Sequence, residues 1–268
     1  MKKMLVFTDL DGTLVDHDTY RFEGARPALE KLRARGTPVI ICSSKTRAEI
    51  EVYRNRMGLD TPFITENGGA VLIPHLTLDL TDTDFVQKGP YDVVILGVAY
   101  ADLCEIWKDI RRKENFLMKG FSEMTVEEIA TNSGLPIEEA RLAAEREYSE
   151  PFIFSDTPKQ FERLVELLKE RGLRTTRGGR FHHLMGENDK GRAVRILSKI
   201  YADTYTDQEI WTVGLGDSDN DAPMLRDVDV PIVIRKKTGE WQRIQELNPV
   251  YSRKAGPEGW AEEILALL

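Results

Sequence analysis

A short apolar run that ends in two closely spaced carboxylates constrains this chain more than any other feature. Met4–Phe7 is apolar throughout and leads directly into Thr8-Asp9-Leu10-Asp11-Gly12-Thr13. The run predicts a buried strand, and two acids at its end repel each other and are costly to bury. The glycine allows a sharp turn and a close approach of a ligand. Asp9 and Asp11 therefore indicate a site for a divalent cation or for proton transfer.

A second acidic cluster follows another apolar run. Trp211–Gly216 predicts a buried strand, and Asp217-Ser218-Asp219-Asn220-Asp221-Ala222 comes directly after it. Acids at alternate positions also open the calcium loop of an EF-hand, which needs glycine at the sixth position and glutamate at the twelfth. Ala222 and Val228 occupy those positions here, so the sequence argues against an EF-hand.

Composition and charge narrow the class of protein. With 268 residues, 41% of them hydrophobic, the chain is long enough for one large α/β domain or two smaller ones. The net charge of −8 argues against a nucleic-acid partner or an anionic membrane surface. No apolar run reaches the roughly 18 residues of a membrane span. Cys42 and Cys104 have no metal-ligand spacing, so we expect a reducing, cytoplasmic location.

The order of the predicted elements indicates an α/β fold. The N-terminal strands are Met4–Phe7, Pro38–Cys42, Phe63–Glu66 and Ala70–Ile73, and the helices are Gly24–Arg35 and Thr46–Met57. The same alternation returns in Lys190–Tyr201 (helix), Trp211–Gly216 (strand), Asn220–Leu225 (helix), Val230–Ile234 (strand) and Pro257–Leu268 (helix). Continuous apolar strands between helices predict a doubly wound, Rossmann-like parallel sheet that is covered on both faces.

The middle of the chain has shorter strands and more highly charged helices, which predicts an inserted α+β domain. We expect residues 1–82 and 187–268 to form the core and residues 83–186 the insertion, with hinges at Leu80–Phe85 and Met185–Asp189. The predicted elements are Tyr91–Gly97, Pro151–Phe154, Leu173–Arg177 and Arg180–Leu184 as strands, and Tyr100–Lys113, Thr125–Asn132, Pro136–Glu147 and Pro158–Glu170 as helices. Gly178-Gly179 is typical of a two-residue hairpin turn.

Several candidate residues follow strand ends or begin a helix, where ligands bind in open α/β sheets. Phosphate transfer needs an in-line nucleophile, charge neutralisation and a proton for the leaving alcohol. Asp9 suits nucleophilic attack to give a phosphoaspartate, and Asp11 suits proton transfer. Because Mg²⁺ prefers oxygen ligands, we expect Asp9 and Asp217 to bind it, with help from the Asp11 carbonyl. Asp221 would share in binding the ion or orient its waters.

Two further positions suit phosphate binding. Ser43 follows the strand Pro38–Cys42, where its hydroxyl and the next amides can hold a phosphate at a helix start. An ordinary turn serine would have the same surroundings. Lys190 stands in the first turn of a helix, where the helix dipole disfavours a cation, and this indicates a phosphate partner. A solvent-facing lysine remains the alternative.

These motifs, in this order, resemble those of the haloacid dehalogenase superfamily. The segments that carry the resemblance are Asp9–Thr13, Ser43, Lys190 and Gly216–Asp221. With an insertion between the second and third, they are similar to the Cof-like sugar-phosphatase branch, which has a large α/β cap. The resemblance implies a Mg²⁺-dependent phosphatase of HAD-like fold.

More local segments resemble the mannosyl-3-phosphoglycerate phosphatase family. They are Ser43–Glu49, Ala144–Phe152 and Gly178–Leu184. This resemblance implies a phosphomonoesterase that hydrolyses mannosyl- or glucosyl-3-phosphoglycerate to glycosylglycerate and phosphate. It also adds Ser44 and Lys45 to the phosphate- or substrate-binding residues.

A substrate with both a phosphate and a carboxylate would explain basic residues in the inserted domain. Arg180 could pair with the carboxylate through two hydrogen bonds, and His182 or His183 could contact sugar hydroxyls. Asn67, in the loop Glu66-Asn67-Gly68-Gly69-Ala70, suits a hydroxyl or phosphate contact, although asparagine also favours turns.

Three other functions stay open. A broader sugar-phosphate or nucleotide phosphatase would share the core, and a phosphosugar mutase would return the phosphate to a sugar. A non-catalytic binding module would have the same fold without the activity. The presence of all groups needed for phosphate transfer argues against it. The sugar and the oligomeric state are not determined by the sequence.

Overall fold

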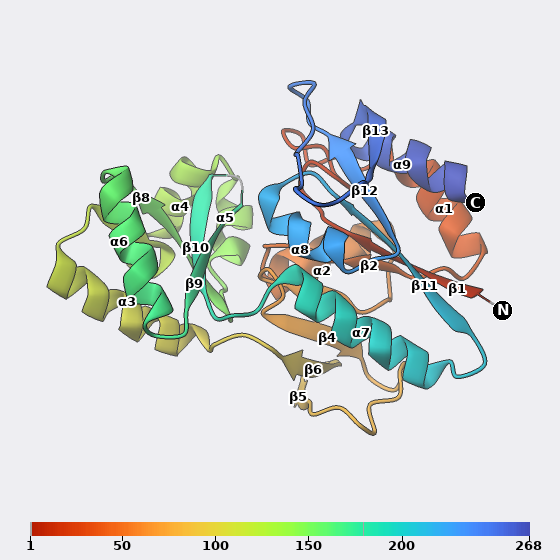
Figure 1. Cartoon of the computed structure of the whole chain (residues 1–268), viewed down its shortest axis with the longest axis horizontal. Helices are drawn as coiled ribbons and strands as arrows, with labels where there is room; N and C mark the ends of the chain where they lie inside the picture. Colours follow the sequence, from red (N-terminus) through yellow and green to blue (C-terminus); the bar gives the residue numbers. More distant parts are fainter. Residues whose placement is uncertain (1, 179) are drawn as a thin grey trace.

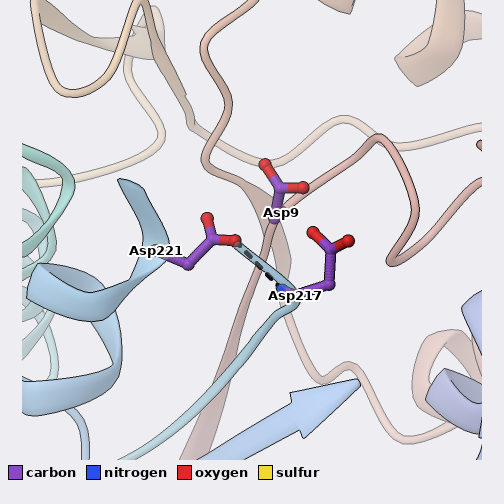
Figure 2. Close-up of side chains that lie close together, drawn as sticks. All are labelled: Asp9, Asp217 and Asp221. Carbon is purple, nitrogen blue, oxygen red and sulfur yellow. Dashed lines mark hydrogen bonds between the residues drawn. The ribbon is translucent and has the colours of Figure 1, made fainter. Parts of the chain in front are cut away.

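A parallel five-stranded sheet forms the centre of the larger domain. The computed structural model describes residues 2–178 and 180–268 (Figure 1). The strand order is β13-β12-β11-β1-β2, and each neighbouring pair is parallel. The strands are β1 (Lys2–Thr8), β2 (Val39–Ile41), β11 (Glu209–Gly216), β12 (Val230–Arg235) and β13 (Val250–Ala255). Because they run the same way, their carboxyl ends share one rim, where Asp9 follows β1 and Asp217 follows β11 (Figure 2).

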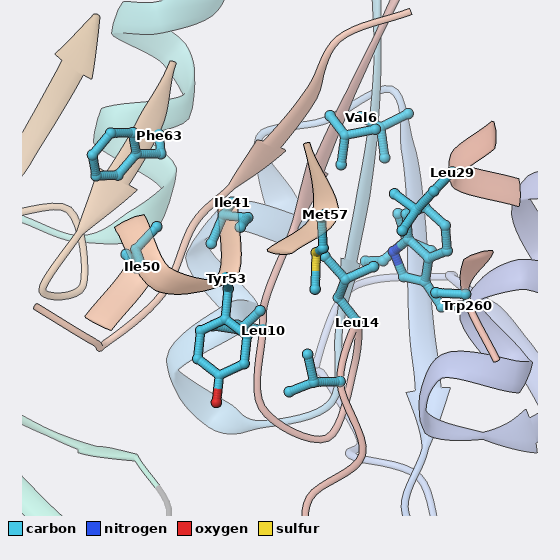
Figure 3. Packing of buried hydrophobic residues seen from close by; sticks show 14 of the residues in the cluster. Val6, Leu10, Leu14, Leu29, Ile41, Ile50, Tyr53, Met57, Phe63 and Trp260 are labelled. Carbon is cyan, nitrogen blue, oxygen red and sulfur yellow. The ribbon is translucent and has the colours of Figure 1, made fainter. Parts of the chain in front are cut away.

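Helices cover both faces of this sheet. Along β1 the side chains alternate, so that Val6 packs on one face while Leu5 and Phe7 pack on the other. The Val6 face is covered by α1 (Arg26–Ala34), α2 (Arg47–Met57) and α9 (Gly256–Leu267), and the opposite face by α7 (Lys190–Thr204) and α8 (Ala222–Arg226). Figure 3 shows Trp260 of α9 in the first of these clusters. The doubly wound α/β core predicted from the sequence is confirmed.

A smaller antiparallel sheet adjoins the core beside β2. Its order is β3-β4-β6-β5, and a bridge between Cys42 and Ile64 connects it to the end of β2. The strands are β3 (Phe63–Thr65), β4 (Ala70–Pro74), β5 (Val86–Lys88) and β6 (Tyr91–Ile95). Val93 and Val94 of β6 pack into the two core clusters. β5 and β6, which follow Leu80–Phe85 in the chain, therefore belong to this sheet beside the core. The division at residues 82 and 83 stays a prediction, and this pairing favours a boundary between β6 and the next helix.

The inserted domain contains a four-stranded antiparallel sheet of order β7-β8-β10-β9. Its strands are β7 (Met118–Gly120), β8 (Ser149–Phe154), β9 (Arg174–Gly178) and β10 (Phe181–Met185). One face packs against α3 (Tyr100–Glu114) and α6 (Pro158–Lys169), and the other against α4 (Val126–Ser133), α5 (Ile137–Ala143) and the 3-10 turn η1 (Phe121–Glu123). The α4 and α5 side faces the core, where α5 lies against α2 (Figure 1).

Some predicted elements differ from the structure. The helix expected over Pro136–Glu147 ends at Ala143. The next three amides bind carbonyls of the same segment, and those of Glu147 and Tyr148 bind Glu66 of the core. The helix expected over Asn220–Leu225 opens with the 3-10 turn η2 (Asp219–Asp221) before α8. In the hairpin turn predicted at Gly178-Gly179, Gly179 lies outside the described residues, while β9 and β10 on either side of it pair as expected.

Within residues 2–178 and 180–268, no helix combines the length and the apolar character needed to cross a bilayer.

Replacing Trp260 tests how much this buried residue contributes to the stability of the core next to the strand ends. The indole is fully buried, and its Nε1 donates to Thr8 Oγ1 at 3.0 Å, while Thr8 Oγ1 donates to the carbonyl of Asp9 at 2.7 Å. We expect Trp260→Ala to lower the free energy of unfolding by about 3–5 kcal/mol, since it leaves a large cavity. The measurement is urea unfolding. The control is Leu265→Ala, which removes a partly exposed side chain from the same helix. Equal losses in the two variants would contradict the prediction.

Candidate active site

Three buried carboxylates converge at the rim of the parallel sheet. Asp9 follows β1, Asp217 follows β11, and Asp221 ends η2. Each offers an oxygen that lies within 4.8 Å of the oxygens of the other two, and Figure 2 shows the three side chains gathered at one place. Carboxylates this close and this buried repel one another strongly, so the site needs compensating positive charge.

Lys190 supplies part of that charge. Its side chain is fully buried at the first position of α7, and its Nζ lies 2.6 Å from Asp9 Oδ1 and 2.6 Å from Asp221 Oδ1. Burial alone would lower the pKa of this lysine, but attraction to Asp221 and Asp9 outweighs burial and raises the pKa above its ordinary value. The ammonium group therefore stays charged. The sequence predicted a phosphate partner for this lysine. The structure shows it paired with two carboxylates, and its contact with a phosphate stays a prediction.

The remaining negative charge fits a divalent cation. Burial, followed by the negative charge of Asp221, raises the pKa of Asp217 to about 6 and that of Asp9 well above its ordinary value. One ammonium faces three carboxylates, so a second cation would relieve the repulsion that remains. Carboxylate oxygens are the donors that Mg²⁺ prefers. The donor set of Asp9, Asp217 and Asp221 therefore fits a hard divalent cation.

Asp221 is held more tightly than the other two carboxylates. Its Oδ2 accepts the backbone N–H groups of Asp217 and Ser218, both at 3.0 Å, while Oδ1 accepts from Lys190. These bonds make Asp221 well suited to orient the loop that carries Asp217. Whether it also binds the cation directly stays a prediction.

Gly12 permits the close approach of the two acidic loops. Its φ is +78°, and a Cβ at this position would lie 2.8 Å from Asp217 Oδ2. Any other residue would therefore have a strained left-handed backbone and would clash with the carboxylate. The glycine after Asp11 is required by the geometry of the site.

Asp11 lies beside a second buried cation. Lys45 Nζ is 3.4 Å from Asp11 Oδ2 and 3.0 Å from Glu49 Oε1. The other oxygen of Asp11, Oδ1, is buried and has no hydrogen-bond partner in the part of the chain that the structure describes. Sequence reasoning missed Glu49, although its spacing from Thr46 is that of a capping box, which the structure contains.

The other predicted phosphate-binding residues lie at different depths. Ser43 is buried and its Oγ accepts the N–H of Lys45 at 3.3 Å, whereas Ser44 lines the cavity described below. Asn67 is buried behind Asn220, whose Nδ2 donates to Asn67 Oδ1 at 3.0 Å. Contacts of these residues with a substrate stay predictions.

A cavity of about 1060 Å³ separates the two domains above the carboxylates. From the core it is lined mainly by acidic and basic side chains. The inserted domain contributes three arginines and His183 together with apolar residues such as Phe121, Leu135 and Phe181. The ionisable residues that line it include Asp9, Asp11, Lys45, Asp217, Arg146, Arg177, Arg180 and His183. Arg180 is exposed, and one of its guanidinium nitrogens donates to the carbonyl of Ser133 at 2.6 Å.

A buried acid that the sequence analysis did not single out joins the two domains. Glu66 accepts hydrogen bonds from Glu147 N at 2.8 Å, Tyr148 N at 3.1 Å and Ser149 Oγ at 2.9 Å, and it pairs with Arg146 at 3.2 Å. All four partners belong to the segment that follows α5. Single-sequence patterns gave no signal for this contact, because the partners are about 80 residues away.

Comparisons with known proteins agree with this geometry. Residues 6–244 match the family of haloacid dehalogenase-like hydrolases. The chain is 42% identical to a glucosyl-3-phosphoglycerate/mannosyl-3-phosphoglycerate phosphatase of Methanococcoides burtonii, covering 99% of this chain and 97% of the relative. It is 40% identical to the protein of the same name from Persephonella marina, with the same coverage.

A solved structure shares the fold. It is that of a phosphatase of the haloalkanoate (HAD) enzyme superfamily from Bacteroides thetaiotaomicron, which is 19% identical. The alignment covers all of this chain and 95% of the other, with a TM-score of 0.69.

Gly12→Ala should weaken divalent cation binding. The added Cβ would press against Asp217 Oδ2, so we expect the affinity for Mg²⁺ to fall by about 10–100-fold, as for changes next to metal ligands. The measurement is titration calorimetry. Gly36→Ala is the matched control, because Gly36 also has a positive φ (+62°) but nothing lies within 4 Å of its Cβ position. Alanine at either position has a similar backbone strain. An equal loss of Mg²⁺ affinity in both variants would contradict the role given to Gly12.

Proposed function

The chain belongs to the haloacid dehalogenase-like hydrolases, and we propose that it is a phosphatase that releases phosphate from glucosyl-3-phosphoglycerate or mannosyl-3-phosphoglycerate. One observation carries the chemistry: buried Asp9, Asp217 and Asp221 lie together, Lys190 pairs with Asp9 and Asp221, and Asp9 and Asp217 line a cavity between two domains. The choice of substrate is supported by two relatives that carry this name and are 40–42% identical over nearly the whole chain.

In the proposed reaction, Asp9 forms the bond to phosphorus and Asp11 transfers the protons. An Asp9 carboxylate oxygen attacks phosphorus, and the bond from phosphorus to the glycerate oxygen breaks. Asp11, in its protonated form, gives a proton to that leaving oxygen. Asp11 then takes a proton from water as the water attacks the phosphoaspartate, which releases inorganic phosphate and restores Asp9. Lys190 holds Asp9 in place throughout.

The cofactor in this proposal is Mg²⁺, held by Asp9, Asp217 and the carbonyl of Asp11, with Asp221 as a further ligand or orienting group. The ion would supply positive charge to the oxygens of the transferring phosphoryl group. Asp221 keeps Asp217 in place through the two amide hydrogen bonds. Ser43 and Lys190 complete the set of groups that we assign to the phosphate.

The cavity suits a substrate larger than a simple phosphate ester. Its volume of about 1060 Å³ is at the upper end of ordinary small-molecule sites. Ser44, Lys45 and Arg180 line it, and we assign them to the carboxylate and neighbouring groups of the substrate. The chain's net charge of −8 favours such a small molecule over a nucleic acid. We also propose a cytoplasmic location, because both cysteines are buried free thiols.

Asp9→Asn should abolish turnover while the protein stays folded. The amide cannot attack phosphorus, but its oxygen can still accept from Lys190. We expect kcat to fall by at least about 10³-fold, as when a nucleophile is removed. The measurement is phosphate release together with a circular dichroism melting curve. Asp203→Asn, an exposed change on α7, is the control and should keep wild-type activity. A folded Asp9→Asn variant with most of its activity would show that the nucleophile lies elsewhere.

A panel of phosphate esters tests the substrate. We expect kcat/KM for mannosyl- or glucosyl-3-phosphoglycerate to exceed that for an aryl phosphate by at least about 100-fold. The reason is that contacts with the sugar and the glycerate, away from the reacting phosphate, also stabilise the transition state. A chelator should abolish all activity, and added Mg²⁺ should restore it. A stronger preference for hexose phosphates or nucleotides would favour a broader phosphatase. An isomerised sugar phosphate without release of inorganic phosphate would indicate a mutase.

A further inference from the structure

Two adjacent histidines of the inserted domain point to opposite faces of its sheet. His182 and His183 are neighbours on β10, where successive side chains alternate between faces. The sequence offered both as contacts for a sugar. The structure gives them different surroundings, so their roles separate.

His182 packs on the side away from the core. Its ring lies 5.4 Å from the ring of Phe152 in a stacked arrangement and 4.5 Å from the ring of Phe161. Phe152 belongs to the cluster formed with α3 and α6. These contacts are those of a packing residue within the inserted domain.

His183 lies on the core-facing side and lines the cavity. Only 6% of its surface is exposed, and its Nδ1 is buried without a hydrogen-bond partner among residues 2–178 and 180–268. A buried polar group without a partner is costly. The other ring nitrogen, Nε2, is the one that lies beside polar atoms of the core.

Polar atoms of the core converge beside this histidine. A Cβ placed on Gly178 would lie 3.5 Å from Asn220 Nδ2, 3.6 Å from His183 Nε2 and 3.8 Å from Ser44 Oγ. The three atoms come from η2, β10 and the loop after β2. They therefore surround one small space at the boundary between the two domains, next to the loop that carries Asp217 and Asp221.

The imidazole of His183 is uncharged. Burial, followed by the positive charge of Arg146, lowers the pKa of His183 to about 3. A neutral imidazole has one donor and one acceptor, and a hydroxyl group offers the same combination. The charged parts of the substrate have other partners in the cavity, namely the cation site and the side chains of Lys45 and Arg180.

We propose that His183, with Asn220 and Ser44, forms a hydroxyl-binding subsite that recognises the sugar of the substrate. This inference rests on the proposed function. Glycerate has two hydroxyl groups, of which one carries the phosphate and the other the sugar in a glycosyl-3-phosphoglycerate. All free hydroxyls of the substrate therefore belong to the sugar. His183 determines specificity for the glycosyl ester, whereas His182 packs the inserted domain.

The test compares the same substitution at the two neighbouring positions. kcat/KM is measured for mannosyl-3-phosphoglycerate, for its glucosyl analogue and for 4-nitrophenyl phosphate, which has no sugar. In His183→Phe we expect the ratio of glycosyl ester to aryl phosphate to fall about tenfold, the size of one good hydrogen bond, mostly through KM. In His182→Phe the ratio should stay within about twofold of wild type. His183→Gln, whose amide brings a donor and an acceptor to the region of Nε2, should restore part of the ratio.

Each other outcome overturns the subsite. An unchanged ratio of kcat/KM values in His183→Phe would show that this histidine contacts only water and not the sugar. An equal fall for all three esters, or a fall in His182→Phe as large as in His183→Phe, would indicate a structural role. If His183→Phe does not fold, His183→Leu, which also lacks a hydrogen-bonding group, takes its place, and an unchanged ratio in that variant overturns the subsite alone. If the wild type hydrolyses only the aryl phosphate, the proposed function fails as well.

Discussion

The buried ion cluster around Lys190 is the interaction on which the rest of this structure depends. Its ammonium group lies 2.6 Å from carboxylate oxygens of both Asp9 and Asp221 and is fully buried. Without it, three carboxylates could not be placed together in the interior, since each unpaired charge would cost several kcal/mol. The parallel sheet brings these residues to one rim, and Gly12 lets the loops that carry them approach each other.

A second buried charge pair connects the two domains and lies close to the first. Glu66 of the core binds Arg146 of the inserted domain, and Arg146 also donates to the carbonyl of Ser44 at 3.1 Å. Ser44 lines the cavity beside Lys45. Breaking a buried pair by removing one partner typically costs about 3–5 kcal/mol. The arrangement of the domains seen here is therefore coupled to the loop that we assign to phosphate and substrate.

The sequence predicted the catalytic core well because local patterns carry that information. Continuous apolar runs predicted β1 and β11, and the acids directly after them had to meet at one rim. Short strands with few apolar residues, such as β5 (Val86–Lys88) and β13 (Val250–Ala255), gave no such pattern and were missed. The end of α5 was also missed, because no glycine or proline marks it and the segment after it binds the distant Glu66.

The side chains that face the substrate were harder to predict than the chemistry. His182 and His183 have the same residue type and differ by one position, so composition and motif could not separate them. Their difference depends on which face of β10 meets the core, and this is set by the packing of α3 and α6 against the other face. Asn67 was predicted to contact the substrate. Its Oδ1 accepts a hydrogen bond from Asn220, and its contact with a substrate stays a prediction.

A crystal structure with Mg²⁺ and orthovanadate, a mimic of the transferring phosphoryl group, tests the central claim most directly. We expect the ion bound to carboxylate oxygens of Asp9 and Asp217, with vanadium next to the free oxygen of Asp9 and Lys190 still in contact with Asp9. An ion or vanadate bound elsewhere in the cavity, with Asp9 and Asp217 turned away from it, would contradict their assigned roles.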